Sequence, residues 1–278
     1  MKTVIVAIDF SADSTSTIDY AIAYAKAFAV EKMILYYAYE IPVTGDPLSP
    51  VIQMFDYDVL RKTNEENFHH LVKGLKVDHD FGNLQIEEVC ELNDFSSGLN
   101  DACIKYGAEL VFVSITQDDG WENGLFAGDA LTIAKNTIVP VIVVPQKAVF
   151  KPIEKVLLAC DFKKIIETTP IEAIRDIIGI TKAKLLVLNV NHTGESYSTD
   201  MEHEIRMLDG LLKELYPAFH FIDNEDFMQG INQFVDEQQV DIVVTIPKKH
   251  GFFEKLFRKS HVKMLAFHSH VPLMVIHD

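Results

Sequence analysis

The sequence has little cysteine, a single tryptophan and no membrane-length hydrophobic run. Its three cysteines, Cys90, Cys103 and Cys160, are far apart, odd in number and without the spacing of a zinc site. This pattern favours free buried thiols in a reducing compartment over a disulfide framework. The N-terminus offers only a short apolar run, 4–8, which ends at Asp9 and is too short for a signal peptide or a membrane span. We therefore expect a cytoplasmic protein that does not enter a membrane.

Positive charge is also scarce, because 25 lysines and arginines face 41 aspartates and glutamates and leave a net charge of −16. Such an acidic balance argues against a general nucleic-acid binder. With 48% hydrophobic and 24% charged residues, the composition is that of an ordinary globular protein. Its 278 residues exceed one typical domain and fit two of roughly 130 to 150 residues each.

Recognised catalytic signatures are missing. The sequence contains no Walker loop, dinucleotide fingerprint or nucleophile elbow. The pair His203-Glu204 is not a zinc-protease signature, because the required second histidine is replaced by Met207. His268 and His270 are two residues apart, so on a helix they point to different sides and do not form a metal site. We nominate no catalytic residue and no metal ligand, and we favour a protein that is not an enzyme.

Apolar runs alternate with helical patterns throughout the first half of the chain. This alternation predicts a parallel α/β sheet with helices on both faces. The expected strands are 4–10, 33–38, 85–91, 109–115 and 139–145, and the expected helices begin near Ser11 or cover 57–75, 95–106 and 128–136.

The second half of the chain repeats the first. At an offset of 152, residues 4–10 align with 156–162 and residues 33–38 align with 185–190. Towards the end of each half the offset becomes 132, because the second half has a shorter middle. Several landmarks align in order, so we predict two tandem five-stranded domains, residues 1–147 and 151–278.

A strand that ends in Asp-Phe before a helix, the β-α repeat and a closing Val-Pro-Val-Ile-Val-Val strand together resemble the universal stress protein family. Each half of the chain shows this resemblance. It implies a Rossmann-like fold of the adenine nucleotide alpha hydrolase type, in which many members bind ATP or another adenine nucleotide at the strand ends and others bind none. Members commonly dimerise through the last strand, so residues 141–144 and 273–276 are expected to pair within one chain as a pseudo-dimer that hides two sheet edges.

The resemblance also implies particular site residues. The family's strand-end acid falls on Asp9 and Asp161, and the second-strand residue beside adenine falls on Ala38 and Val190, of which Val190 is the usual residue. Each aspartate has two open interpretations: a contact to adenosine, or a carboxylate that caps a turn or helix.

Nucleotide-binding members carry a glycine-rich loop after the fourth strand, whose backbone amides approach the phosphates. The loop reads Gly, two residues, Gly, nine residues, Gly, and then Ser or Thr. In the first half this pattern falls on Ser114, Gln117, Ala127 and Gly128, none of which is the expected residue. In the second half it falls on Ile246, Lys249, Lys259 and Ser260, of which only Ser260 matches. Both loops depart from the pattern.

The two loops have opposite charge. The first is acidic, which opposes a triphosphate. The second is basic, and Lys249, His250, Lys259 and Ser260 can hold an anion through their side chains. An alternative interpretation is a basic amphipathic helix with solvated lysines and buried phenylalanines.

Together these features predict a non-catalytic stress-response protein that acts by binding a small anionic ligand or a protein partner. One alternative is an adenine-nucleotide switch or slow ATPase that uses ATP or AMP in the second domain. Another is an interaction module whose basic C-terminal segment docks an acidic partner or the acidic first half. The ligand and any oligomer beyond the pseudo-dimer stay open.

Overall fold

The computed structural model describes residues 1–8, 10, 12–41, 57–115, 133–191, 199–247 and 271–277. The first half contains β1 (Thr3–Ala7), α1 (Ala12–Ala27), β2 (Lys32–Tyr39), α2 (Tyr57–Asp78), β3 (Gln85–Leu92), α3 (Phe95–Tyr106), β4 (Leu110–Ile115) and β5 (Val141–Pro145). The second half contains β6 (Lys155–Ala159), α5 (Ile165–Thr168), α6 (Ile171–Thr181), β7 (Lys184–Asn191), α7 (Thr199–Leu212), η1 (Lys213–Leu215), β8 (Ala218–Asp223), α8 (Phe227–Gln238), β9 (Ile242–Thr245) and β10 (Leu273–Val275). Residues 133–136, in the last helix expected in the first half, are helical.

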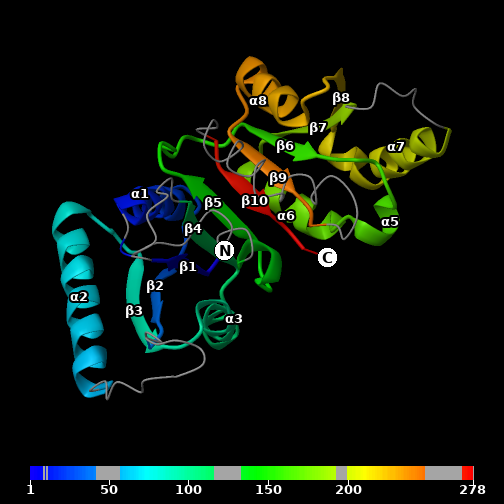
Figure 1. Cartoon of the computed structure of the whole chain (residues 1–278). Coiled ribbons are helices and arrows are strands. Elements are labelled where there is room, and N and C mark those ends of the chain that lie inside the picture. The colour runs from blue at the N-terminus through cyan, green and yellow to red at the C-terminus, as the bar shows by residue number, and fades with distance from the viewer. Residues whose placement is uncertain are drawn as a thin grey trace, which may run out of the picture.

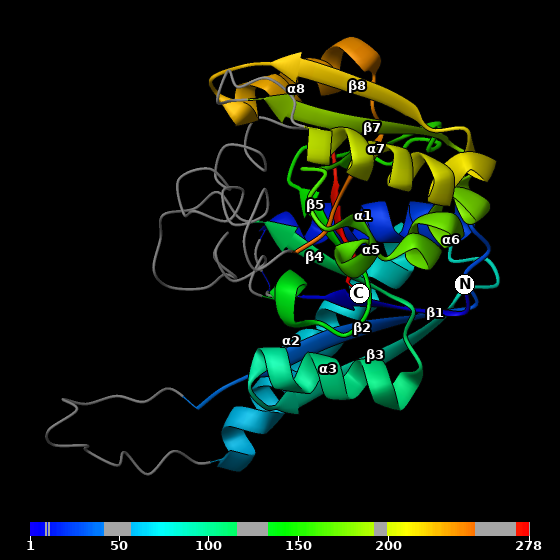
Figure 2. The same cartoon turned by 90° about the vertical axis from the view of Figure 1, so that its right-hand side faces the viewer.

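The strands of the described residues form one ten-stranded sheet in the order β3-β2-β1-β4-β5-β10-β9-β6-β7-β8. All pairs within a half are parallel, whereas β5 and β10 are antiparallel, with Ile142 opposite Met274. Figures 1 and 2 show the two halves on either side of this central pair. The predicted pairing of the two last strands within one chain is therefore confirmed.

The sheet register preserves the internal repeat. Val4 pairs with Met33 and Val156 pairs with Leu185, which are the same positions at an offset of 152. Likewise, the pairing of β4 with β5 is reproduced by β9 with β10 at an offset of 132. Two tandem five-stranded units are thus confirmed, while the exact residues of the boundary between them stay a prediction.

Two hydrophobic layers run across both halves, one on each face of the sheet. One layer is formed with α1, α2, α6 and α7, and the other with α3 and α8. Ile142 and Met274 belong to the first layer, whereas Val141 and Val275 belong to the second. Both hydrophobic layers therefore continue from one half to the other through the β5–β10 pair.

The second half departs from the first where α1 would be repeated. Two helices, α5 and α6, occupy this region, and between them Thr169 has an extended backbone with φ −115°. Pro170 explains the break, because proline lacks an N–H and disfavours a helical conformation at the preceding residue. The shorter middle of the second half is confirmed, since α7 has 14 residues where α2 has 22.

The first strand of each half ends before the Asp-Phe pair, whereas the sequence predicts strand as far as the phenylalanine. Phe10 has φ +58° and Phe162 has φ +49°, so both lie in the left-handed region. A strand cannot continue through that conformation. The same sharp turn therefore leads from β1 and from β6 towards the following helix.

The three cysteines are free, as predicted; Cys103 and Cys160 are buried and Cys90 is half-buried. In the described part of the chain, no helix is long and apolar enough to cross a membrane. Over the same residues, no three His, Cys, Asp or Glu side chains are grouped to hold a metal ion. The cytoplasmic location stays a prediction.

Candidate functional site

Ligands of open parallel sheets bind beyond the carboxyl ends of the strands, where the strand order reverses. In each half this reversal lies beside the first strand, between β1 and β4 and between β6 and β9. Because β5 and β10 are antiparallel, the carboxyl ends of the two halves lie at opposite edges of the sheet. The chain thus offers two separate strand-end sites, which we compare position by position.

Asp161 lies just beyond β6. The pairing of Ala159 with Leu188 places Asp161 level with Val190 on the neighbouring strand β7. Its Oδ1 accepts a hydrogen bond from the backbone N–H of Lys163 at 3.2 Å. Asp161 therefore makes the turn contact that one of its two interpretations predicts. Asp161 and Val190, which the family resemblance assigns to one site, lie side by side.

Side chains from other elements hold the turn around Asp161. Asn189 Nδ2 donates to the carbonyl of Cys160 at 2.9 Å, and Glu204 Oε2 accepts from the N–H of Ile165 at 2.8 Å. The Phe162 ring is 2% exposed and lies 5.7 Å, centroid to centroid, from that of Phe221. These contacts hold Phe162 at its positive φ, a conformation that costs a non-glycine residue roughly 1 kcal/mol.

Val190 lies on an apolar surface. It is 5% exposed and pairs with Ile222 of β8. Helix α8 packs against both residues, since a methyl group added at Gly230 would lie 3.1 Å from Val190 Cγ1 and 3.3 Å from Ile222 Cδ1. Asp226 starts this helix by accepting a hydrogen bond from the N–H of Gln229 at 3.1 Å.

Thr245 ends β9 on the same face of the sheet, two residues after Val243, which belongs to the hydrophobic layer of Val190. It is fully buried, and its hydroxyl has no hydrogen-bond partner among the residues that the structure describes. We call the group Asp161, Val190, Ile222, Gly230 and Thr245 the second-half strand-end face.

The first half has a different surface at the equivalent positions. Ala38 pairs with Glu91, whose Oε1 accepts a hydrogen bond from the buried Tyr36 hydroxyl at 2.9 Å. Burial and this hydrogen bond raise the pKa of Tyr36. Gly98 lies so close that an added methyl group would be 2.2 Å from Tyr36 Oη, and Val113 occupies the position of Thr245. A carboxylate thus lies next to Ala38, where the second half has isoleucine.

Sequence reasoning missed Glu91 and Tyr36. The available signal was strand register, because pairing residues 33–38 with 86–91 brings Glu91 opposite Ala38. Of the predicted site residues, the structure brings Asp161 and Val190 together and places Ala38 at the equivalent point of the first half. The remaining predicted residues lie outside the described part of the chain: Asp9, Gly128, Lys249, His250, Lys259 and Ser260.

Residues 1–145 match the family model described as the universal stress protein family. The chain belongs to the universal stress protein family. A universal stress protein from Archaeoglobus fulgidus has a similar structure, with a TM-score of 0.65 at 14% identity, and the match covers 99% of this chain and 96% of that one. A protein of unknown function from Pseudomonas aeruginosa matches with a TM-score of 0.58 at 12% identity, over 99% and 92% of the two chains. A comparison with curated protein sequences gave no significant match.

These two structural similarities extend over nearly the whole chain, so the tandem arrangement of this universal stress protein also occurs in other solved structures. At such low identity they establish the fold and leave the ligand to be argued from the residues themselves.

Proposed function

We propose that this universal stress protein is a non-catalytic stress-response protein that binds one adenine nucleotide, ATP or AMP, per chain. The ligand lies on the second-half strand-end face. In this proposal the first half is a structural partner that completes the sheet and does not bind nucleotide.

One observation carries the proposal: Val190 has Ile222 as its neighbour, whereas Ala38 has Glu91. A flat adenine ring is favoured by an apolar surface. A carboxylate in the same place remains hydrated and repels the phosphates of the nucleotide. The second half is therefore the better adenine site.

Two polar groups of this face complement the apolar surface. The Asp161 carboxylate is an acceptor for the hydroxyl groups of a ribose. The buried Thr245 hydroxyl, which lacks a partner among the described residues, is available to a polar group of the ligand. Lys249, His250, Lys259 and Ser260 remain the sequence-based candidates for the phosphate groups.

The hydrogen bonds of the turn around Asp161 support binding over catalysis. Asp161 accepts the N–H of Lys163, and Asn189 donates to the Cys160 carbonyl. These polar groups hold a turn in place, which suits a surface that is preorganised for a ligand.

The experiment is calorimetric titration with ATP and AMP, with and without Mg²⁺. Wild-type protein is compared with Ile222→Glu, which gives the second half the carboxylate of the first. Ala218→Glu is the matched control, because it adds the same charge on the same face of β8 but near the opposite end of the strand. We expect Ile222→Glu to weaken binding by at least about tenfold, and Ala218→Glu to bind like wild type. Absence of binding by wild-type protein, or equal binding by both variants, contradicts the proposal.

A further inference from the structure

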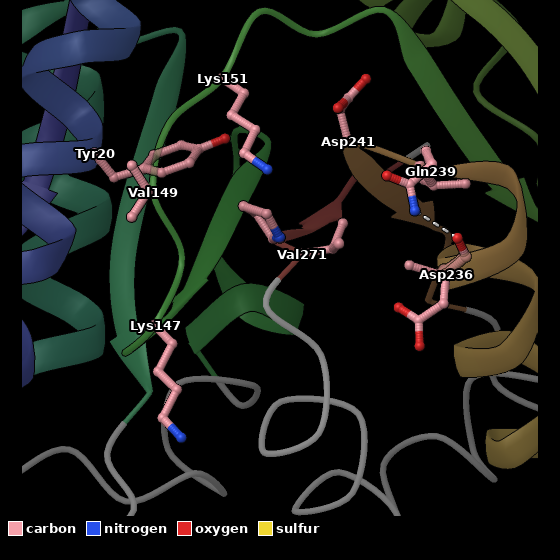
Figure 3. A pocket seen from close by; sticks show the side chains of 11 residues that line it. Tyr20, Lys147, Val149, Lys151, Asp236, Gln239, Asp241 and Val271 are labelled. Atoms are coloured by element: carbon pink, nitrogen blue, oxygen red, sulfur yellow. Dashed lines mark hydrogen bonds between the residues drawn. The ribbon is translucent and has the colours of Figure 1, made fainter.

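A cavity of about 190 Å³ lies between the two halves of the chain, apart from either strand-end site. One wall comes from Tyr20 of α1 and from the segment that follows β5, which carries Lys147 and Lys151 (Figure 3). The opposite wall comes from the end of α8 and the starts of β9 and β10, and includes Asp236 and Gln239. The cavity therefore depends on both halves.

The internal repeat does not produce a second copy of this cavity. The connecting segment between β5 and β6 occurs once, and it supplies both lysines. The repeat places Ile104 and Gly107 at the positions of Asp236 and Gln239, so the polar wall is also absent from the first half. Gly230 and Gln238, the last residue of α8, are separated by about 12 Å of helix rise, which keeps the cavity apart from the second-half strand-end face.

Tyr20 provides the strongest indication of a ligand. The residue is 3% exposed, and its ring packs edge-on against Phe150 at 5.4 Å. Its hydroxyl points into the cavity (Figure 3) and makes no hydrogen bond to another described residue. Burial, together with the neighbouring Tyr24 and Asp241, raises the pKa of Tyr20, so the hydroxyl remains a neutral donor.

Lys151 reaches the same space as the Tyr20 hydroxyl (Figure 3). An ammonium group and a hydroxyl donor that converge in this way suit a carboxylate, because hydrogen bonds with ionised partners are the strongest available in proteins. This part of the cavity is therefore suited to an anionic group.

The opposite wall suits a cation. Gln239 Nε2 donates to the backbone carbonyl of Asp236 at 2.7 Å, which fixes the amide and leaves its oxygen as an acceptor. Lys155 donates to the carbonyl of Gln238 and so already caps part of the helix end. The Gln239 side-chain oxygen remains to receive an ammonium group, whereas the Asp236 carboxylate points away from that oxygen (Figure 3).

The other aspartate in the lining has a structural role. Asp241 Oδ2 accepts the backbone N–H groups of Glu154 and Lys155 at 2.8 and 2.9 Å, and so holds the end of the connecting segment against β9. Val271 supplies apolar surface between the two walls, and Val149 and Val235 add apolar surface to one wall each (Figure 3). The lining contains two lysines and two aspartates, whose charges cancel, so a ligand without net charge fits best.

We propose that this cavity binds a free amino acid with an aliphatic side chain. The carboxylate lies between Lys151 and Tyr20, the ammonium group lies against the Gln239 side-chain oxygen, and the aliphatic side chain contacts the valines.

The test is calorimetric titration of the full chain with valine, leucine and isoleucine, each as a separate probe. The key variants are Tyr20→Phe and Tyr24→Phe. Tyr24 is a close control, because it lies one turn along the same helix, is 2% exposed and packs against the same ring of Phe150, but does not line the cavity. Tyr20→Phe is expected to weaken binding by about tenfold, whereas Tyr24→Phe is expected to bind like wild type.

Small molecules that carry only one of the two charged groups of an amino acid test the proposed chemistry. Acetate offers only the carboxylate and methylamine offers only the cation, so each is expected to bind far more weakly than the amino acid. Acetate binding as tight as that of the amino acid would show a simple anion site and overturn the proposal. It is also overturned if none of the three amino acids binds, or if the two tyrosine variants bind equally.

Discussion

The hydroxyl of Tyr36 donates a hydrogen bond to Glu91 Oε1 at 2.9 Å, where the second half has Leu188 and Ile222 at the equivalent positions. Two halves with the same sheet register therefore present different surfaces at their strand ends. In the first half a buried polar pair lies beside Ala38, whereas in the second half Val190 has apolar neighbours. This difference is the basis for placing the nucleotide in the second half.

The close approach of α3 to the Tyr36–Glu91 pair can be tested with Gly98→Ala. The added methyl group would lie 2.2 Å from Tyr36 Oη, so something must shift. We expect a loss of about 1 to 3 kcal/mol in the free energy of unfolding, measured by urea denaturation.

The same change in a Tyr36→Phe background is the control, because that protein lacks the nearest of the three atoms that the methyl group would meet, while Asn93 Nδ2 and Glu91 Oε1, each at 2.8 Å, remain. We expect a smaller effect of Gly98→Ala there, with a coupling of about 0.5 kcal/mol or more. Strict additivity of the two substitutions would show that the helix does not press against the hydroxyl.

The β5–β10 pair predicts that the halves stabilise one another. Ile142 is fully buried opposite Met274, in a layer shared by both halves, so Ile142→Ala is expected to cost about 2 to 5 kcal/mol. Hydrogen exchange should accelerate in both β2 and β7. Ile180→Ala, at a residue 39% exposed, serves as the control and should change stability by less than about 0.5 kcal/mol. Faster exchange in β2 alone would contradict mutual stabilisation.

The hydrogen bond of Asp94 at the start of α3 is expected to make a pH-dependent contribution to the free energy of unfolding. Its Oδ1 accepts the N–H of Ser97 at 2.8 Å, and this hydrogen bond lowers the pKa of Asp94. The stabilisation is present above the ordinary pKa of aspartate, about 3.9, and is lost as the pH falls through the lower folded value. Asp94→Ala should therefore cost about 1 kcal/mol at pH 7. Chemical denaturation should show this difference shrinking below pH 4, and a constant difference down to pH 2 would rule out the charged cap.

The cysteines should react slowly in the folded protein. Burial raises the pKa of both Cys90 and Cys103 to about 11. At pH 8 their thiolate fraction is then roughly a hundredfold lower than that of a free cysteine. Alkylation by iodoacetamide, followed by mass spectrometry, should be slow in buffer and fast in urea. Rapid modification of Cys103 without urea would show that α3 opens readily.

Asp161→Asn separates the two roles considered for that residue. Asparagine retains an oxygen that can accept the N–H of Lys163, so the turn should persist, while the charged acceptor for a ligand is lost. We expect nucleotide affinity to fall by about tenfold or more, with Asp209→Asn on the exposed side of α7 as the charge control. Unchanged affinity in Asp161→Asn would leave this aspartate with its turn role alone.

Much of the fold followed from sequence because it depends on repeated local patterns. The offset that aligns residues 4–10 with 156–162 also relates the strand pairing of the two halves. The pairing is conserved between the halves because shifting a strand by one residue would turn its buried side chains to the opposite face of the sheet. The break at Pro170 was missed, although a proline in the middle of a helical pattern is itself a signal.

The candidate site was predictable only in part. Asp161 and Val190 lie at the carboxyl ends of the neighbouring strands β6 and β7, one just beyond its strand and the other inside it, and motif spacing locates such positions well. The pairing of Ala38 with Glu91 is a contact between strands far apart in the sequence, and it requires the register of an edge strand. Tyr20 of the first half and Gln239 of the second line opposite walls of one cavity, and no local pattern predicts that they lie so close.

Native mass spectrometry of the freshly purified protein tests the central claim most directly, because a retained nucleotide appears as added mass. After addition of AMP or ATP, we predict one bound nucleotide per chain for wild-type protein and for Ala218→Glu, and none for Ile222→Glu. Two bound nucleotides per chain, or one that persists in Ile222→Glu, would contradict a site confined to the second half.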